Sequence, residues 1–325
     1  MIEVKNLTKV FKIAKKEKGI WGSIKGLFNR KYIIKKALDD VSFTINDGDI
    51  VGYLGPNGAG KSTTIKIMCG ILTPTSGECV INGMIPWKDR ANYVKDIGVV
   101  FGQRSQLWWD VPVIDSFYLL KDIYKIPDDV FADQLKILTE KLDLQEIINY
   151  PLRQLSLGQK MKCELAGSLL HKPKILFLDE PTIGLDATSK LKVRDFIKNI
   201  NKEFGITVIL TTHDMNDIEA LTNKIIIIGK GKLLYNGSFD AIKHKYKNHR
   251  IVEVEFEQEY DNVDIPKFKL IKKEGKVFTF KTDDNDFKLA DFVVDLSKKY
   301  KVVDVQVESI GLEEIISKMF GDLGV

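Results

Sequence analysis

The chain has 325 residues and a mass of 36.9 kDa, which is enough for one large or two modest domains with buried cores. Hydrophobic residues make up 44% and charged residues 29%, a composition that excludes a disordered or fibrous protein. The net charge is only +4, and the basic residues are concentrated in one segment, which indicates a local partner rather than general nucleic-acid binding. No apolar run approaches the roughly 18 residues of a membrane helix, so the chain is not expected to cross a bilayer alone.

The first residues and the cysteines predict a cytoplasmic protein. The start of the chain, MIEVKNLTKVF, lacks the successive charged, apolar and small segments of a secretory signal. Cys69, Cys79 and Cys163 have no spacing typical of a metal site. Their odd number suits buried thiols in a reducing compartment.

The N-terminal part is predicted to contain a strand, a loop and a helix in succession. Residues 1–11 and 37–54 have the pattern of short strands, the second ending in an apolar run. A glycine-rich turn at 55–60 follows, and then a helix from Lys61 to about Cys69. Gly70 can end this helix in a left-handed conformation.

The middle of the chain alternates helices with buried strands. Residues 113–165 are mostly helical in pattern and predict a helical subdomain. Ile175 to Leu178 and Thr207 to Leu210 are continuous apolar strands, separated by a helix near 187–202. Such strands are typical of a parallel sheet that is buried on both faces, so residues 1–235 are predicted to form an α/β domain.

The pattern changes after the apolar run at 225–228. Two amphipathic helices are predicted, at about 285–299 and 311–320. Four segments alternate apolar and polar residues as half-exposed strands do: 251–257, 268–272, 276–282 and 301–307. We therefore expect a small C-terminal α+β domain over 236–325, with the boundary near 236–248.

The strongest chemical motif is a phosphate-binding loop between an apolar strand and a helix. Its residues are Gly55, Pro56, Asn57, Gly58, Ala59, Gly60, Lys61, Ser62 and Thr63. The glycines let successive backbone N–H groups turn toward phosphates, and the start of the helix adds a favourable field. Lys61 is expected to reach the β and γ phosphates, and the Ser62 hydroxyl to bind Mg²⁺.

A pair of carboxylates follows the apolar strand at 175–178. Asp179 and Glu180 stand at its carboxyl end, which is where open α/β sheets bind ligands. Asp179 suits a Mg²⁺ ligand, and Glu180 suits polarising a water for attack on the γ phosphate. A strand ending in Asp-Glu is common, and the upstream phosphate loop is what favours the functional interpretation.

A third motif begins the helix that follows residue 155. Its sequence is Leu155-Ser156-Leu157-Gly158-Gln159. Ser156 at a helix N-terminus presents a hydroxyl and free N–H groups to an anion. On its own, the segment is equally explained as a simple helix cap.

The order of these motifs resembles that of the nucleotide-binding subunit of ABC transporters over about residues 1–235. The resemblance rests also on Gln103, Gly184-Leu185-Asp186 and Thr211-Thr212-His213-Asp214. It implies a P-loop NTPase core with an antiparallel β subdomain and a helical subdomain. The family signature is usually LSGGQ, and Leu157 replaces its first glycine here, which alters the backbone freedom at that position.

The resemblance implies further roles for site residues. Gln103 looks like the residue that contacts Mg²⁺ and the attacking water, and His213 looks like the switch histidine at the γ phosphate. Asp186 lies in the loop that crosses between subunits. Two subunits are implied to sandwich two ATP molecules. The second subunit would complete each site with its own signature residues, Ser156, Gly158 and Gln159.

Adenine is expected to stack on an aromatic side chain upstream of the phosphate loop. Phe11 occupies the matching place at the end of the first strand. Tyr32 is closer in sequence to Lys61 and remains the alternative. A purely structural core aromatic is the other explanation of either residue.

Residues 12–36 form a concentrated basic insertion. They carry nine Lys or Arg residues against one Glu, a net charge of +8, so the rest of the chain sums to −4. Apolar residues at helical spacing accompany them: Ile20, Trp21, Ile24, Leu27 and Phe28. The insertion is hypothesised to lie on an anionic membrane surface or against a permease, and packing on the protein's own β subdomain is the alternative.

The segment after Gln103 reads RSQLWWD, and the adjacent tryptophans beside a polar loop are more typical of interfaces than of cores. They are expected to receive a cytoplasmic helix of the permease, with packing in the helical subdomain as the alternative. This segment and the end of the chain look most like exporters of the ABC-2 type, whose permease is a separate chain.

The predicted function is therefore that of an ATP-hydrolysing subunit of a membrane exporter, bound peripherally at the inner face of the cell membrane. ATP and Mg²⁺ are the expected cofactors, and a second copy and transmembrane permease subunits are the expected partners, without nucleic acid. An importer ATPase is one alternative. A soluble ATPase with a mechanical or assembly role is another, although Lys61 to Ser156 shows no sustained heptads of a long coiled coil.

Overall fold

The computed structural model describes residues 1–14, 32–102, 105–246, 250–282, 288–309, 315–317 and 321. The chain divides into two compact units, Met1–Ser238 and Phe239–Val325. Among the described residues, no helix is both long and apolar enough to span a membrane. Each unit is described by itself.

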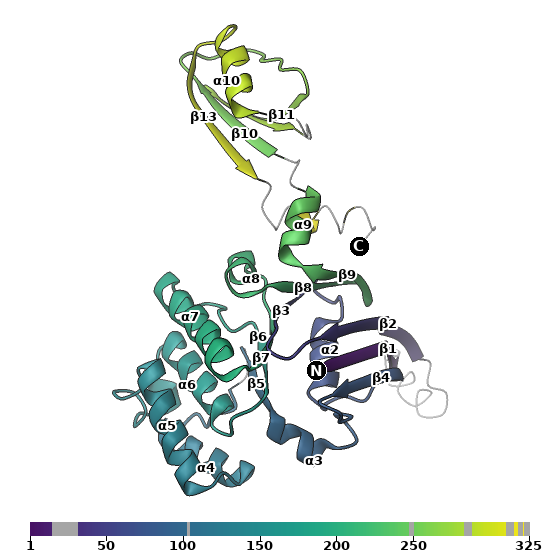
Figure 1. Ribbon diagram of the computed structural model, residues 1–325, viewed down its shortest axis with the longest axis vertical. Coiled ribbons are helices and arrows are strands. Elements are labelled where there is room, and N and C mark those ends of the chain that lie inside the picture. The colour runs from purple at the N-terminus through teal and green to yellow at the C-terminus, as the bar shows by residue number, and fades with distance from the viewer. Residues whose placement is uncertain are drawn as a thin grey trace, which may run out of the picture. The chain divides into compact units, whose positions relative to one another are not determined.

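The first unit is built on a mixed sheet with strand order β5-β6-β7-β3-β8-β9 (Figure 1). All neighbours except β8 and β9 are parallel. The strands are β3 (Ile50–Leu54), β5 (Ile97–Phe101), β6 (Ile175–Asp179), β7 (Thr207–Thr211), β8 (Lys224–Gly229) and β9 (Lys232–Ser238). Every residue of β3 and β7 is buried, as the apolar sequence of both predicts.

Helices lie against this sheet and at its side (Figure 1). The core helices are α2 (Lys61–Met68), α7 (Ala187–Phe204) and α8 (Met215–Leu221), and the short α3 (Arg90–Tyr93) precedes β5. A helical subdomain follows β5 and consists of α4 (Val113–Tyr124), α5 (Asp128–Leu142) and α6 (Leu157–Leu169). Helices α2 and α7 and the helical subdomain agree closely with the prediction, whereas α3 and α8 were not predicted.

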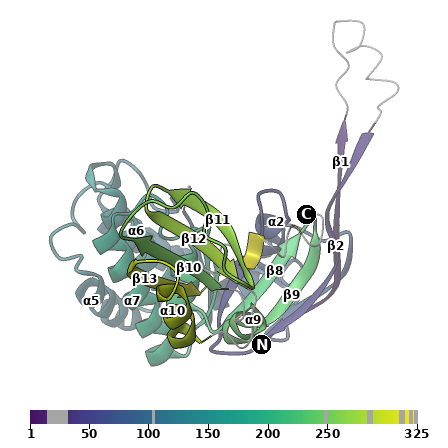
Figure 2. The ribbon, with the colours of Figure 1, turned by 90° about the horizontal axis from the view of Figure 1, so that it is seen from above.

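A second, antiparallel sheet has the strand order β2-β1-β4. Its strands are β1 (Ile2–Ala14), β2 (Tyr32–Ile45) and β4 (Ser76–Ile81). Strand β4 pairs with β1 only as far as Thr8, whereas β1 and β2 stay paired up to Ala14 and Tyr32. Beyond β4 they therefore continue as a two-stranded ribbon (Figure 2).

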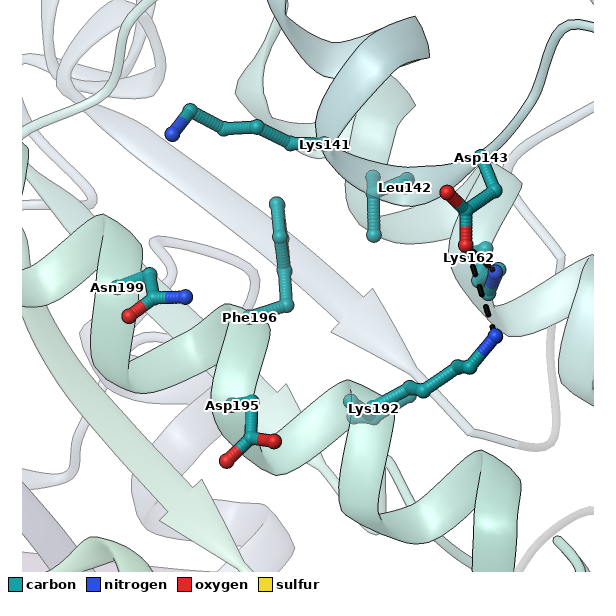
Figure 3. A pocket seen from close by; sticks show the side chains of 9 residues that line it. Lys141, Leu142, Asp143, Lys162, Lys192, Asp195, Phe196 and Asn199 are labelled. Carbon is teal, nitrogen blue, oxygen red and sulfur yellow. Dashed lines mark hydrogen bonds and ion pairs between the residues drawn. The ribbon is translucent and has the colours of Figure 1, made fainter.

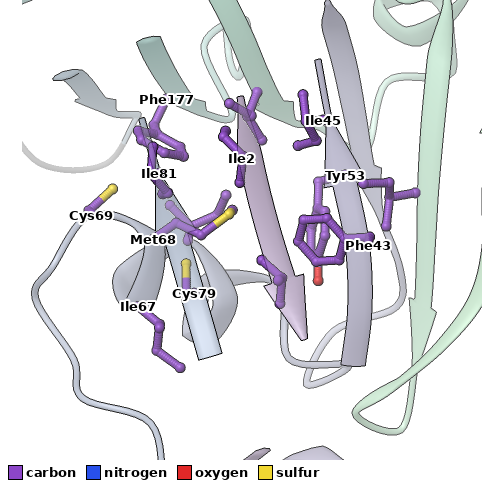
Figure 4. Close-up of a cluster of buried hydrophobic side chains, with 14 of the residues drawn as sticks. Ile2, Phe43, Ile45, Tyr53, Ile67, Met68, Cys69, Cys79, Ile81 and Phe177 are labelled. Atoms are coloured by element: carbon purple, nitrogen blue, oxygen red, sulfur yellow. The ribbon is translucent and has the colours of Figure 1, made fainter. Parts of the chain in front are cut away.

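The main core of this unit lies where the antiparallel sheet meets α2 and the parallel strands (Figure 4). Phe43 and Tyr53 meet with ring centroids 5.8 Å apart, and the buried Tyr53 hydroxyl bonds to Thr64 at 3.0 Å. Cys69, Cys79 and Cys163 are buried and free, as predicted. The predicted α/β class, with its antiparallel and helical subdomains, is confirmed.

The second unit contains a four-stranded antiparallel sheet with the order β11-β12-β10-β13. Its elements are α9 (Phe239–Tyr246), β10 (Arg250–Phe256), β11 (Phe268–Glu274), β12 (Val277–Thr282), α10 (Leu289–Ser297) and β13 (Val302–Ser309). Alternate residues of β10 are buried, and they pack in one cluster with Phe278, Phe280 and the α10 residues Phe292 and Leu296. One face of the sheet is thus covered and the other is polar, as alternation predicts.

Several predicted boundaries were wrong. The strands predicted at 1–11 and 37–54 reach further, to Ala14 and back to Tyr32, because cross-strand pairing continues through the basic sequence. Strands β4, β5 and β9 were missed. Helix α10 is shorter than the predicted 285–299, and of the predicted helix at 311–320 only residues 315–317 are described as helical. The apolar stripe at 20–28 lies outside the described residues.

Candidate functional site

The loop at 55–63 connects the end of β3 to the start of α2. Gly60 has φ +111°, and a Cβ there would lie 2.6 Å from the Ala37 carbonyl oxygen. A Cβ at Gly55 would lie 2.3 Å from the carbonyl oxygen of Ile228 in β8. Both positions therefore exclude any side chain, and the loop is a tight backbone cradle of the kind that phosphates fill.

Lys61 is the first residue of α2 and is 9% exposed. Its Nζ donates hydrogen bonds to the carbonyl oxygens of Gly55 at 2.5 Å and Pro56 at 3.2 Å. Burial lowers the pKa of Lys61 from its ordinary value, and the charges of Glu180 and Asp179 act in the opposite direction. The ammonium thus lies in the cradle within the field of both carboxylates.

Within the same loop, Asn57 and Gly58 are exposed and Ala59 is buried. The Ala59 backbone is fixed on both sides, because its N–H bonds to Pro56 at 3.1 Å and its carbonyl accepts from Gly231 at 2.9 Å. Ser62, the second residue of α2, is exposed, and Thr63 is partly buried. The Ser62 hydroxyl is therefore accessible to a metal ion that accompanies a phosphate.

The Asp-Glu pair lies at the carboxyl ends of β6 and β7. Asp179 Oδ1 accepts a hydrogen bond from the buried Thr211 hydroxyl, and the Glu180 N–H bonds to the Thr211 carbonyl at 2.9 Å. Glu180 adopts φ +56°, a strained value for a non-glycine residue. Its Oε1 lies 3.2 Å from Nε2 of His213, which is half exposed. Three predicted residues from two loops thus meet at one sheet edge.

A metal ion at this edge would have few protein ligands. Across the described part of the chain, no group of three or more His, Cys, Asp and Glu side chains is arranged to hold a metal. Asp179 and Ser62 are the described candidates. This donor set fits Mg²⁺, which usually keeps several waters and takes its other ligands from substrate phosphates.

Gln103 lies outside the described residues, but its neighbour Gly102 is close to the carboxylate pair. The Gly102 N–H bonds to the Asp179 carbonyl at 2.8 Å, and a Cβ at Gly102 would lie 2.6 Å from the Glu180 carbonyl oxygen. The end of β5 is therefore held directly against the Asp179–Glu180 backbone.

The signature segment begins α6 and forms a capping box. The Gln159 N–H bonds to Ser156 Oγ at 3.3 Å, and the Ser156 N–H bonds to Gln159 Oε1 at 2.9 Å. A Cβ at Gly158 would lie 2.7 Å from Ser189 Oγ in α7. Both explanations of Ser156, a helix cap and an anion site, are compatible with this geometry.

Leu157, which departs from the family pattern, is half exposed and lies over Gly184. A Cβ at Gly184, which has φ +70°, would lie 2.9 Å from the Leu157 side chain. Two residues on, Asp186 caps α7 by accepting from the Ser189 N–H at 2.9 Å and the Ser189 hydroxyl at 2.6 Å. These bonds lower the pKa of Asp186.

The two adenine candidates lie on the β1–β2 ribbon. Phe11 pairs with Lys35, two residues from Ala37, whose carbonyl touches Gly60. Tyr32 is five residues from Ala37, which along a strand is roughly 17 Å against about 7 Å for Phe11. Phe11 is partly buried, with the Lys9 ammonium 5.3 Å from its ring centroid. The distances along the strand therefore favour Phe11.

A buried link between residues 105–106 and α6 was missed from the sequence. Glu164 is 6% exposed, and its carboxylate accepts from the Ser105 hydroxyl and from the Gln106 N–H at 3.2 Å. Burial raises the pKa of Glu164. A Cβ at Gly167 would lie 3.1 Å from the Leu107 side chain. A glutamate among apolar residues of a helix was the available signal.

Comparisons with known proteins show the family of the chain. The family model described as "ABC transporter" matches residues 38–183. The Bacillus subtilis protein called ABC transporter ATP-binding protein NatA is 30% identical over 229 residues, which cover 70% of this chain and 92% of that protein. The Escherichia coli protein called probable multidrug ABC transporter ATP-binding protein YbhF is 35% identical over 226 residues. That match covers 69% of this chain but only 38% of YbhF.

Solved structures share the fold. A dimeric ATP-binding cassette in a post-hydrolysis state, bound to ADP and Pi, is 27% identical with a TM-score of 0.61, and the match covers 73% of this chain and 98% of that one. An ATP-binding subunit of an ABC transporter has a TM-score of 0.63 at 23% identity, covering 76% and 93%. From its motifs, its fold and these relatives, the chain belongs to the family of ABC transporter ATP-binding proteins.

Proposed function

We propose that this chain is the ATP-hydrolysing subunit of an ABC exporter, working as a dimer that drives a separate transmembrane permease. The observation that carries the proposal is the approach of Glu180 and His213 to 3.2 Å at the sheet edge that also holds Asp179. Lys61 and its cradle share this edge, because their loop follows β3, which lies beside β7 in the parallel sheet. This arrangement places a general base beside a phosphate-binding loop, which suits attack of water on a γ phosphate.

Each residue of this edge then has a separate task in the reaction. The loop from Gly55 to Thr63 binds the phosphates through its N–H groups, and Lys61 neutralises their charge. Glu180 accepts the proton of the attacking water. His213 contacts the γ phosphate. Ser62, Asp179 and Gln103 would hold Mg²⁺, which would polarise the phosphate oxygens.

A second copy of the chain completes each site. Ser156, Gly158 and Gln159 of one copy face the ATP bound to the other, and Asp186 lies in the loop that crosses between them. The dimeric assembly of the similar cassette structure supports this arrangement. Phe11 stacks on the adenine. Its strand partner Lys35 is two residues from Ala37, whose carbonyl oxygen lies beside Gly60 of the phosphate loop, and this position supports the stacking role.

The permease is expected to contact the segment that follows Gln103. Trp108 and Trp109 are 58% and 53% exposed, although both are large apolar side chains. The Lys160 ammonium lies 4.4 Å from the Trp109 ring centroid. These side chains form a surface suited to a cytoplasmic helix of the permease. The export direction is supported by the multidrug name of the similar YbhF protein.

The β1–β2 ribbon is the proposed contact with the inner face of the cell membrane. Ile13, Tyr32, Ile33 and Ile34 are all about half exposed or more. Lys12 and Lys35 accompany them, within a sequence segment of charge +8. Apolar and basic side chains together favour an anionic lipid surface. The chain would thus be cytoplasmic and peripheral.

Purification from native membranes tests the transporter assignment. The tagged chain is solubilised gently with the membranes, and the proteins that co-purify are identified. A multi-spanning permease without its own ATPase supports the proposal, and a solute-binding protein in the same complex would turn the assignment to an importer. Soluble partners alone would contradict it and favour a mechanical or assembly ATPase.

Trp108→Ala and Trp109→Ala should release the permease, whereas Trp87→Ala, on a partly buried tryptophan elsewhere, should retain it.

A further inference from the structure

Asp217 in α8 carries a fully buried carboxylate that has no role in the site described so far. Its Oδ1 accepts a hydrogen bond from Arg194 Nε at 2.6 Å and also pairs with Nη2 of the same guanidinium. Its Oδ2 accepts from the Thr182 hydroxyl and, at 3.1 Å, from the Thr212 hydroxyl. Both carboxylate oxygens are therefore fully satisfied.

The donors come from three different elements. Arg194 lies on α7, Thr182 follows Glu180 by two residues, and Thr212 directly precedes His213. Thr182 and Thr212 are 2% and 5% exposed. One carboxylate is thus bonded to both loops whose side chains, Glu180 and His213, approach to 3.2 Å. The hydrogen bonds to Asp217 therefore join the two loops at Thr182 and Thr212, which lie within two residues of Glu180 and His213.

Stability alone does not explain such a group. Burying two charges costs more than an exposed pair does, and a buried ion pair often contributes little net stability compared with apolar residues of similar size. A fully satisfied polar network does, however, hold its members in one arrangement. The guanidinium fork adds directional specificity to the carboxylate. The bonds of Asp217 are therefore suited to fixing positions.

A second ion pair extends the connection from α7. Lys190 Nζ lies 2.6 Å from Asp214 Oδ2, and the Asp214 N–H bonds to Thr212 Oγ1 at 3.0 Å. Helix α7 is thus tied to the His213 loop on both sides of the histidine. Asp186 is the N-cap of the same helix, so the network joins the loop that is proposed to cross between subunits to the His213 loop.

We propose that Asp217 and Arg194 are positioning residues for ATP hydrolysis. They hold the Glu180 loop and the His213 loop at the separation that attack on the γ phosphate requires, without touching the nucleotide themselves. This inference rests on the proposed ATPase function.

The test measures steady-state ATP hydrolysis by the full chain. Asp217→Asn removes the charge and keeps the size, and kcat should fall at least about tenfold, since a displacement of about 1 Å can cost about 100-fold. KM for ATP should stay within about twofold because the Lys61 cradle is separate. Thr182→Val, which removes only one hydroxyl donor, should lower kcat by about threefold. Thr182→Ser, which keeps the hydroxyl, should retain the wild-type kcat.

The matched control is an exposed carboxylate in an ion pair elsewhere. Asp143 pairs with Lys162 at 3.2 Å and Lys192 at 3.6 Å beside a surface pocket between α5, α6 and α7 (Figure 3). Asp143→Asn makes the same chemical change and should leave kcat unchanged. In a His213→Ala background, Asp217→Asn should cost clearly less than in the wild-type chain, because one of the two side chains that it positions is gone.

Three outcomes would overturn the inference: an unchanged kcat in folded Asp217→Asn, losses that multiply fully in the His213→Ala background, or a parallel rise in KM. If Asp217→Asn does not fold, Thr182→Val against Thr182→Ser decides the question. A wild-type chain without ATP hydrolysis would instead refute the proposed function, which is a distinguishable result.

Discussion

The two units use β-sheets in opposite ways. In Met1–Ser238 the central strands run parallel, so their carboxyl ends share one edge. Loops after β3, β6 and β7 meet there, which is why Lys61, Asp179, Glu180 and His213 lie together. In Phe239–Val325 neighbouring strands are antiparallel, and successive loops leave at opposite ends. Strand direction, more than composition, therefore determines whether reactive side chains meet at one edge of a sheet.

The first prediction compares the same substitution at one glutamate in each unit, and it has the largest expected change in ATP hydrolysis. Glu180→Gln should lower ATP hydrolysis by about 10² to 10⁴ while ATP still binds and dimerises the chain, because a general base is lost. Glu253→Gln makes the same change on the exposed face of β10 and should leave hydrolysis unaltered. Phosphate release and ATP-dependent dimerisation by light scattering measure both. Equal activity in Glu180→Gln would remove this residue from the proposed role.

The second prediction concerns the independence of the units. Phe280 on β12 is 1% exposed and packs in the apolar cluster of the C-terminal unit. Phe280→Ala should therefore destabilise this unit by about 3 to 5 kcal/mol. ATP hydrolysis should stay within about twofold. Urea unfolding followed alongside hydrolysis is the measurement, with Val303→Ala, at a 61% exposed position, as the control. A parallel loss of hydrolysis would show that the C-terminal unit supports the site.

The third prediction tests the tight cradle. Gly60→Ala places a Cβ 2.6 Å from the Ala37 carbonyl oxygen, and the strain of about 1 to 3 kcal/mol should weaken ATP binding about 5- to 150-fold. Gly48 also has a positive φ, +77°, but a Cβ there meets nothing within 4 Å. Gly48→Ala should therefore leave ATP affinity unchanged in calorimetric titration. Similar losses in both variants would contradict the steric argument.

The fourth prediction compares vesicle binding after the same substitution of an exposed lysine in each unit, and it has the smallest expected effect. Lys35→Gln on the ribbon should weaken flotation with anionic vesicles by about 1 kcal/mol, roughly fivefold, at low salt. Lys269→Gln on β11 makes the same change in the other unit and should have no effect. Neutral vesicles provide a second control. If deletion of residues 13–34 leaves vesicle binding unaltered, the proposed membrane contact is wrong.

Sequence was sufficient where chemistry depends on local spacing. The phosphate loop needs glycines at fixed positions, and the buried strand before Asp179 is a continuous apolar run, so both were predicted with their elements. The class of the fold followed from the same periodicities. The family resemblance supplied Gln103 and His213, which local patterns alone do not distinguish from ordinary strand-end residues.

Contacts between distant segments could not be predicted from one sequence. Nothing in the isolated helix near 215–221 indicates that Asp217 meets Arg194, because the two are joined only after α7 and α8 pack. The reach of the β1–β2 ribbon was missed for a similar reason. Residues 12–36 were interpreted as one basic insertion, whereas cross-strand hydrogen bonds pair residues 10–14 with 32–36.

The three buried cysteines have a practical consequence for chemical labelling. Burial raises the pKa of Cys79 and Cys163 to about 12, and that of Cys69 is raised as well, so their thiolates are scarce and shielded at neutral pH. Maleimide reagents should therefore modify the native chain slowly. A single cysteine introduced at an exposed position would carry a fluorophore or spin label, and the protein needs no prior cysteine removal for distance measurements between two copies.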